Sequence, residues 1–167
     1  KINYSKMIAE ISENIKSTAG AILILLMVGA LSGTWLLSGI IPTMIYYGMQ
    51  ILHPSVFLPA CVVICSVISI ATGSSWTTSA TVGIALMGIG STMGMPLGMV
   101  AGAVLAGAYF GDKLSPLSDT TNLAPAMAGT DLFTHIRYML LTTIPTMVLT
   151  LILFVILGLM QDTSELA

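Results

Sequence analysis

Two short segments of the sequence carry polar groups that can bind a small cation. The first is GDKLSPLSDTTN, residues 111–122, which places Asp112, Lys113 and Asp119 between two apolar stretches. The second is ATGSSWTTSATVG, residues 71–83, which is rich in serine and threonine and has no charged residue. Carboxylate, hydroxyl and backbone carbonyl oxygens are the ligands that small, hard cations prefer. These residue types therefore favour an ion-binding site that draws on both segments.

The segment 111–122 predicts an interruption in a membrane helix. Pro116 removes one helical hydrogen bond and frees nearby carbonyls, and the apolar piece that follows, about residues 121–129, is too short to cross a membrane. A charged side chain at mid-membrane costs roughly 2.5–3.5 kcal/mol. Such residues therefore persist where they pair, face water or bind an ion. The alternative is a surface loop between two transmembrane helices, in which these charges have no special role.

Asp119 is the carboxylate that we expect to bind the ion, with its side chain facing the protein interior. Asp112 is the second candidate, and Lys113 is a candidate charge partner or gate. The neutral oxygens of the segment complete the expected site; they belong to Ser115, Ser118, Thr120, Thr121 and Asn122, and the expected sodium ligands are Asp119, Ser118 and Asn122.

The hydroxyl-rich segment 71–83 separates two apolar stretches and predicts a helical hairpin over about residues 55–91. The tip of that hairpin is polar. Non-helical backbone at membrane depth is stable only when it is buried in protein or lines a water-filled cavity. The alternative is an ordinary turn outside the membrane. The candidate binding residues at the tip are Thr72, Gly73, Ser74, Ser75 and Thr77.

The composition indicates a membrane environment for these elements. Charged residues make up 7% of the chain, against about 25% in soluble domains, and the mean hydropathy is +0.98. Positions 17–111, a run of 95 residues, contain no Asp, Glu, Lys or Arg. One transmembrane helix needs roughly 20 apolar residues, so this run is long enough for several transmembrane segments. With a net charge of −2 and no basic cluster, the chain is not expected to bind nucleic acid.

The hydrophobic pattern predicts an all-α membrane protein: transmembrane helices with a re-entrant helical hairpin and one broken helix, which form one half of an inverted-repeat transporter. An amphipathic interfacial or connector helix is expected at residues 1–17, with a soluble linker as the alternative. The transmembrane half follows at 18–160 and a solvated tail at 161–167. Within that half we expect helices at about 18–37 and 41–52, the hairpin, the broken helix at about 96–129, a polar connection at 131–137, and a last span at about 138–160.

Small residues recur every fourth position along residues 96–111. Ala103, Gly107 and Gly111 form one stripe, and Gly98, Gly102 and Ala106 form another. Small residues at this spacing let helix backbones approach closely in lipid. We therefore expect this helix to pack tightly against a neighbour.

Three strings closely resemble the NhaC-type sodium/proton antiporter family: ATGSSWTTSATVG, AGAYFGDKLSPLSDTTNLA and GTWLLSGIIP. The resemblance covers about residues 18–158, and the chain looks like the C-terminal part of such a carrier. The family belongs to the ion-transporter superfamily, in which paired re-entrant hairpins and broken helices form the site. The resemblance implies that residues 118–122 and 72–75 lie near the bound ion, and that a further N-terminal half supplies matching elements.

Exchange of sodium for protons is the function that the resemblance implies. Sodium or a proton can each neutralise a carboxylate that is shielded from water, but not both at once, and alternating access of the loaded site gives antiport. One alternative is a sodium- or proton-linked exchanger of small carboxylates of the malate/lactate type, and another is an inactive truncated half-carrier. No enzyme is expected, because the sequence shows no nucleophile–base pair, metal-ligand cluster or phosphate loop.

The expected location is the bacterial inner (plasma) membrane, as an integral membrane protein. The expected partners are the lipid bilayer, sodium ions, protons and the N-terminal half of the carrier, and a second copy of the chain, as a homodimer, is a further candidate. No cofactor is expected, since sodium is the transported substrate.

Overall fold

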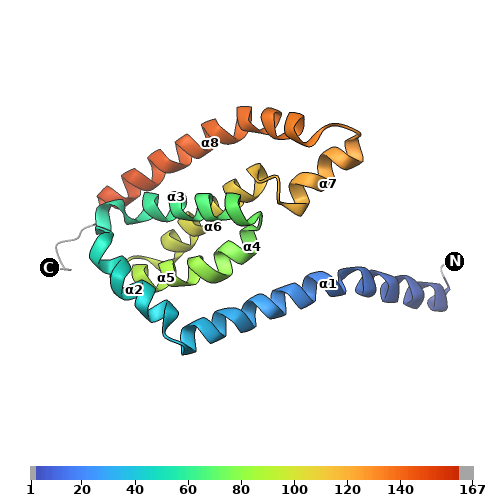
Figure 1. Cartoon of the computed structure of the whole chain (residues 1–167), viewed down its shortest axis with the longest axis horizontal. Helices are drawn as coiled ribbons and strands as arrows, with labels where there is room; N and C mark the ends of the chain where they lie inside the picture. The colour runs from blue at the N-terminus through green and yellow to red at the C-terminus, as the bar shows by residue number, and fades with distance from the viewer. Residues whose placement is uncertain (1–2, 162–167) are drawn as a thin grey trace.

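The computed structural model describes residues 3–161, which are helical almost throughout and contain no strand (Figure 1). The prediction of an all-helical chain is confirmed for these residues. In chain order the elements are α1 (Tyr4–Leu37), α2 (Ile40–Ile51), α3 (Pro54–Thr72), α4 (Ser75–Thr78), a π-helical turn (Ser79–Gly83), α5 (Ile84–Thr92), α6 (Leu97–Leu114), α7 (Asp119–Ala128) and α8 (Leu132–Met160).

Two of these helices are long and apolar enough to cross a membrane. Helix α3 has 19 residues and a mean hydropathy of 2.3, and α8 has 29 residues and a mean hydropathy of 2.5. Only 6% of the most apolar stretch of α8 is buried within the chain. Water would solvate such an exposed apolar face poorly, whereas lipid solvates it well. These helices, together with the long uncharged run, indicate a helical membrane protein.

The core lies between α3 and α6, and α8 packs along the same pair (Figure 1). Gly107 and Gly111 bring the α6 backbone against the α3 backbone, because a Cβ at either position would overlap carbonyl oxygens of α3. The expected close packing of the Ala103 stripe therefore occurs against α3. The core side chains come from four helices and the turn between α5 and α6: Phe57, Leu58, Cys61, Val62 and Cys65 of α3, Leu86 and Ile89 of α5, Met93 and Met95 of the turn, Val100, Ala103, Val104 and Ala108 of α6, and Phe154 of α8.

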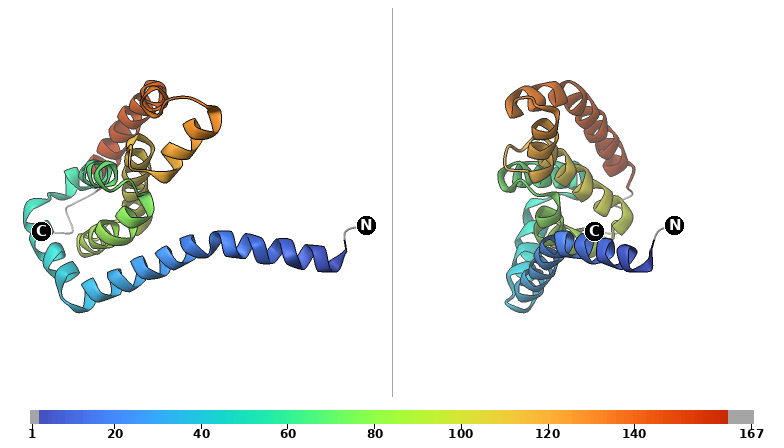
Figure 2. Two further views of the ribbon diagram at one scale, coloured as in Figure 1. Left: turned by 45° about the vertical axis from the view of Figure 1, so that its right-hand side comes forward. Right: turned by 90° about the vertical axis from the view of Figure 1, so that its right-hand side faces the viewer.

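Helix α1 is one continuous helix, whereas the sequence predicted a boundary near residue 17. No proline lies between Tyr4 and Leu37, and the isolated glycines of this stretch do not interrupt the helix, so the amphipathic segment continues directly into the apolar one. The first half of α1 projects away from the other helices (Figure 2). Its second half reaches the hairpin, where the Ser32 hydroxyl donates to the carbonyl of Ala80. Residues 1–2 and 162–167 of the predicted N-terminal helix and tail lie outside the described residues.

Helix α8 begins at Leu132, six residues before the predicted start of the last span. Asp131 is its N-cap, and the Asp131 carboxylate accepts a 3.0 Å hydrogen bond from the Thr134 N–H. Such a cap stabilises the first turn, and the predicted polar connection at 131–137 is therefore the N-cap and the first residues of α8.

Candidate functional site

Helix α3 is joined to the segment from α4 to α5 by a tight turn at residues 73–74, which is the tip of the hairpin. This tip packs against the interruption between α6 and α7. Gly73 ends α3 in the left-handed conformation, with φ at +71°. A Cβ at this position would lie 2.6 Å from the carbonyl carbon of Leu117. Only glycine satisfies both the backbone angle and the close approach. We call this region, residues 70–79 together with 112–118, the crossing.

Two side-chain hydrogen bonds fasten the two parts of the crossing together. The Ser75 hydroxyl, which is buried, donates to Asp112 Oδ2 at 2.8 Å. The Ser115 hydroxyl donates to the carbonyl of Ile70 at 2.7 Å, and Ser115 is completely buried. The structure thus brings together residues of the two segments that the sequence analysis selected.

The interruption itself follows from local chemistry. Ser115 precedes Pro116 and has an extended backbone, with ψ at 127°, as steric contact with a following proline favours. Ser118 is the N-cap of α7, and its hydroxyl accepts from the Thr121 N–H at 3.4 Å. The Thr121 hydroxyl lies 3.0 Å from the carbonyl oxygen of Asp112. The Asp112 carbonyl accepts a long backbone hydrogen bond from the Ser115 N–H, at 3.4 Å, and has no i+4 donor because residue 116 is proline. Thr121 therefore supplies a second donor to this carbonyl at the end of α6.

Asp119 does not face the interior within the described residues, in contrast to the expectation from the sequence. It is the first residue of α7 and is exposed. Its Oδ1 accepts a 2.8 Å hydrogen bond from the N–H of Thr120, and a carboxylate in the first turn of a helix is stabilised there by the helix dipole. This arrangement accounts for Asp119 locally, without an ion.

The other predicted ligands of this segment also stabilise the interruption. The Asn122 side-chain amide donates to the carbonyls of Pro116 and Ser118, both at 2.7 Å. The hydroxyls of Ser118 and Thr120 lie 2.9 Å apart. These groups hold one helix end against the next, so each has a structural role in the described residues.

At the hairpin tip, the predicted residues other than Ser75 form local caps. Ser74 is the N-cap of α4 and its hydroxyl accepts from the N–H of Thr77 at 3.2 Å. Thr72 is exposed and its hydroxyl lies 3.4 Å from that of the buried Thr78. Serine and threonine at these positions therefore hold the turn in shape.

Two buried oxygens at the crossing have no hydrogen-bond partner, and they are the only such side-chain atoms among the side chains that the structure describes. They are Asp112 Oδ1 and the hydroxyl oxygen of Ser79. Leaving such a group unsatisfied costs free energy, and more when the group is charged. Ser79 was not among the residues predicted from the sequence; its position four residues after Ser75, on the same helical face, is the signal that could have indicated it.

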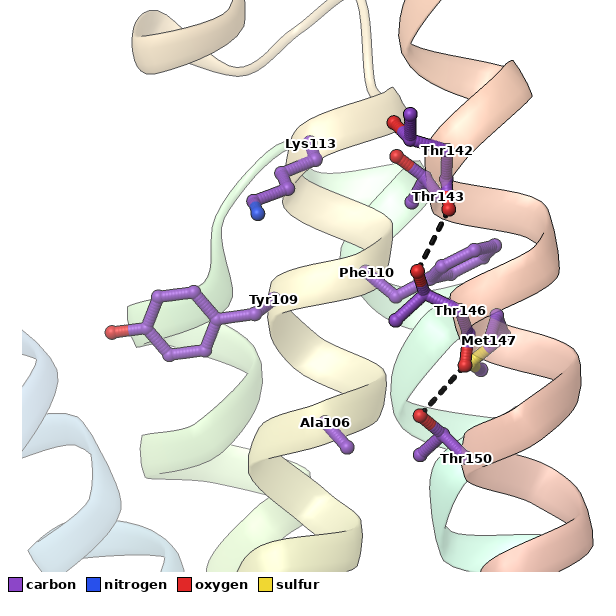
Figure 3. A pocket seen from close by; sticks show the side chains of 9 residues that line it. All are labelled: Ala106, Tyr109, Phe110, Lys113, Thr142, Thr143, Thr146, Met147 and Thr150. Carbon is purple, nitrogen blue, oxygen red and sulfur yellow. Dashed lines mark hydrogen bonds between the residues drawn. The ribbon is translucent and has the colours of Figure 1, made fainter.

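A separate groove of about 310 Å³ lies between α6 and α8 (Figure 3). Lys113 is the one predicted site residue that lines it. On the α8 side, Thr146 and Thr150 donate hydrogen bonds back to the carbonyls of Thr142 and Thr146, both at 2.8 Å. Within the described part of the chain Lys113 forms no ion pair with Asp112 or Asp119, so its expected role as their charge partner has no support in the geometry.

Comparison with known proteins supports the same segments. The Na+/H+ antiporter family matches residues 107–166, which include the interruption. The chain is 51% identical over 164 residues to the malate-2H(+)/Na(+)-lactate antiporter of Bacillus subtilis, covering 98% of this chain and 35% of that protein. It is 44% identical over 164 residues to the Na(+)/H(+) antiporter NhaC of Alkalihalophilus pseudofirmus, covering 98% and 36%. The chain belongs to the Na+/H+ antiporter family.

The relatives of the chain differ in what their names say they carry. The arginine/ornithine antiporter ArcD of Halobacterium salinarum is 44% identical over 161 residues, which are 96% of this chain and 33% of that protein. All three relatives are named as antiporters, and antiporters are transporters, not enzymes. The chain spans about a third of the length of these curated relatives. No solved structure is significantly similar to the chain.

Proposed function

We propose that the chain is part of a secondary transporter that exchanges sodium ions for protons, and that the ion binds at the crossing. The observation that carries the proposal is the contact between Ser75 and Asp112, which joins a hydroxyl-rich hairpin tip to a carboxylate beside an interrupted helix. Interrupted helices that meet at a shared site are the recurring arrangement in secondary transporters. Two relatives whose names include sodium align with nearly the full length of this chain.

Exchange follows from competition for one negative charge. A carboxylate shielded from water is stable when it is neutralised, and either a sodium ion or a proton can neutralise it. If the carrier changes its access only when this charge is neutralised, sodium on one side is exchanged for protons on the other. Ser75 contributes to this step by holding Asp112 in place through Oδ2.

The hairpin tip belongs at membrane depth in this proposal, as a re-entrant element. Ser75 and Thr78 at the tip are 2% and 0% exposed. Of the two non-helical residues, Gly73 is buried and Ser74 is half-buried, so protein covers most of this backbone. Burial in protein is one of the two conditions under which such backbone is stable within a membrane. The remaining part of the carrier would supply a matching half, in the plasma membrane of a bacterium.

Exchange of small carboxylates is the second candidate function. The 51% identity to the malate-2H(+)/Na(+)-lactate antiporter favours it. At the crossing, however, the Ser75 hydroxyl already donates to Asp112, so an organic anion beside Ser75 would meet a carboxylate of like charge. We therefore place ion exchange without an organic anion first.

The experiment uses the intact carrier, purified and reconstituted into liposomes with a pH-sensitive dye inside. An inward sodium gradient should change the internal pH with no organic anion present, and a choline gradient should not. One variant serves as a control for substitution itself: Asp131→Asn should transport normally, because Asp131 is exposed and Asn is an equally good N-cap. Proton movement only when malate or lactate is added would favour the second candidate. No sodium-dependent proton movement under either condition would reject both.

A further inference from the structure

The two unpartnered buried oxygens of the described chain, Asp112 Oδ1 and Ser79 Oγ, belong to one helix–helix interface. Asp112 lies in the last turn of α6, and Ser79 is the first residue of the π-helical turn that continues α4. Both α4 and the π-helical turn pack against α6. The two oxygens without a partner therefore lie on the same helix–helix interface.

The two segments run antiparallel with a register that two contacts fix. At one end Ser75 bonds Asp112 at 2.8 Å. At the other end a Cβ at Gly83 would lie 2.8 Å from Val104 Cγ1. Ser79 lies midway between Ser75 and Gly83, and the same Gly83 Cβ would be 3.9 Å from the Ser79 Cβ. Ser79 therefore shares the side that faces α6, one helical turn from the level of Asp112.

The direction of the side chains narrows that one-turn offset. In a helix each Cα–Cβ bond tilts toward the N-terminus. Ser79 consequently leans toward Ser75 and the level of Asp112, while Asp112 leans back along α6 toward the level of Ser79. Because the segments are antiparallel, the two tilts converge on the same space between the helices.

We infer that Asp112 Oδ1 and the Ser79 hydroxyl are two protein ligands of the transported cation, and that Asp119 is not one of them. The inference rests on the proposed function, and it names the cation site within the crossing. A carboxylate and a hydroxyl are hard oxygen ligands of the kind sodium takes. The single negative charge suits a monovalent ion, since no group of three His, Cys, Asp or Glu side chains gathers anywhere in residues 3–161.

The π-helical turn at Ser79–Gly83 supports this assignment. Single π-helical turns inside α-helices are rare and occur frequently at functional sites. Here the turn begins at the residue whose hydroxyl lacks a partner. By contrast, Asp119 is exposed and accepts its hydrogen bond from the adjacent N–H of Thr120.

The test is equilibrium binding of radioactive sodium to the purified intact carrier at one fixed pH. Asp112→Asn should weaken binding by more than about tenfold, because it removes the charge of a shielded ligand. Ser79→Ala should weaken binding about fivefold, since it removes one neutral ligand. Asp119→Asn and the control Asp131→Asn should both bind within about twofold of the unaltered carrier. A large loss in Asp119→Asn, or unchanged binding in Asp112→Asn, would overturn the inference.

Thermal unfolding separates a lost ligand from a lost fold. Ser79→Ala removes a hydroxyl that has no partner, so without sodium this variant should melt at the same temperature or higher. Its stabilisation by added sodium should be smaller than that of the unaltered carrier, because a weaker ligand stabilises less. This variant carries the test alone if Asp112→Asn does not fold, and an unchanged sodium response would then reject the inference. An unaltered carrier that binds sodium through Asp112 but moves no protons would instead reject the proposed function only.

Discussion

Ser75 and Asp112 are 37 residues apart in sequence, yet the Ser75 hydroxyl donates a 2.8 Å hydrogen bond to Asp112 Oδ2. The bond joins α4 to the last turn of α6 at a point where Ser75 is 2% exposed. A hydrogen bond to a charged group in such a place contributes more than one between neutral groups at the surface. Substitution of either residue is therefore expected to lower the stability of the protein.

Ser75→Ala should weaken the intact carrier in both stability and sodium transport. The substitution removes the hydroxyl that donates to Asp112 Oδ2, at a cost of about 1.5–3 kcal/mol, and frees the carboxylate to move. The measurements are the melting temperature and the sodium concentration for half-maximal transport. Ser91→Ala is the control, because Ser91 is exposed. If both variants behave alike, the hydrogen bond has no role in the carrier.

Gly73→Ala should be strongly destabilising. Alanine is strained at φ +71° by about 1–2 kcal/mol, and its Cβ would also lie 2.6 Å from the Leu117 carbonyl carbon. Gly98→Ala is the matched control, because nothing lies within 4 Å of a Cβ at that helical position; this change should be neutral or stabilising. Yield and melting temperature of the intact carrier provide the readout. Equal behaviour of the two variants would mean that Gly73 and Leu117 are not in contact.

Cysteine labelling should distinguish two adjacent residues of the hairpin tip. Ser75 is 2% exposed and Trp76 is 63% exposed in the described chain. With a bulky thiol reagent, cysteine at position 76 should react faster than cysteine at position 75. The native Cys61 and Cys65 are both completely buried, so the unaltered carrier should give a low background. Rapid labelling at position 75 would indicate an open turn.

Ser118→Ala should destabilise the carrier more than Pro116→Ala. Ser118 is fully buried and caps α7, and loss of such a cap costs about 0.5–2 kcal/mol. Pro116 is exposed, and the hydrogen bonds of Ser118 and Thr121 at the two helix ends do not involve its ring, so Pro116→Ala should leave the interruption in place. Denaturation of both variants by heat gives the comparison. The opposite order would show that proline, and not the caps, maintains the interruption.

Local chemistry in the sequence predicted much of the fold. Pro116 indicated the interruption, the hydroxyl-rich segment indicated the hairpin tip, and the glycine stripe indicated the close packing of α6. These features depend on a few neighbouring residues, so a single sequence reveals them. The continuity of α1 and the early start of α8 at Leu132 were missed, because polar residues inside a helix resemble those of a connection.

The roles of the two carboxylates could not be assigned from spacing alone. Asp112 and Asp119 both lie near Pro116, and the sequence pattern allows either side chain to face the protein interior. Which of them meets the hairpin depends on the register of α4 against α6, a tertiary relation that the contact at Gly83 and Val104 fixes. The π-helical turn at Ser79 likewise has no signal in local propensity, since it arises from packing.

The glycines that press α6 onto α3 also determine what can move. At Gly107 and Gly111 no side chain separates the two backbones, and the Ser69 hydroxyl of α3 donates to the Ala108 carbonyl of α6 at 2.6 Å. Sliding either helix along the other by a turn would force larger side chains into that narrow contact. The pair is therefore expected to move as one rigid unit, and in the proposed carrier a motion that opens the ion path to one side of the membrane would have its hinges elsewhere.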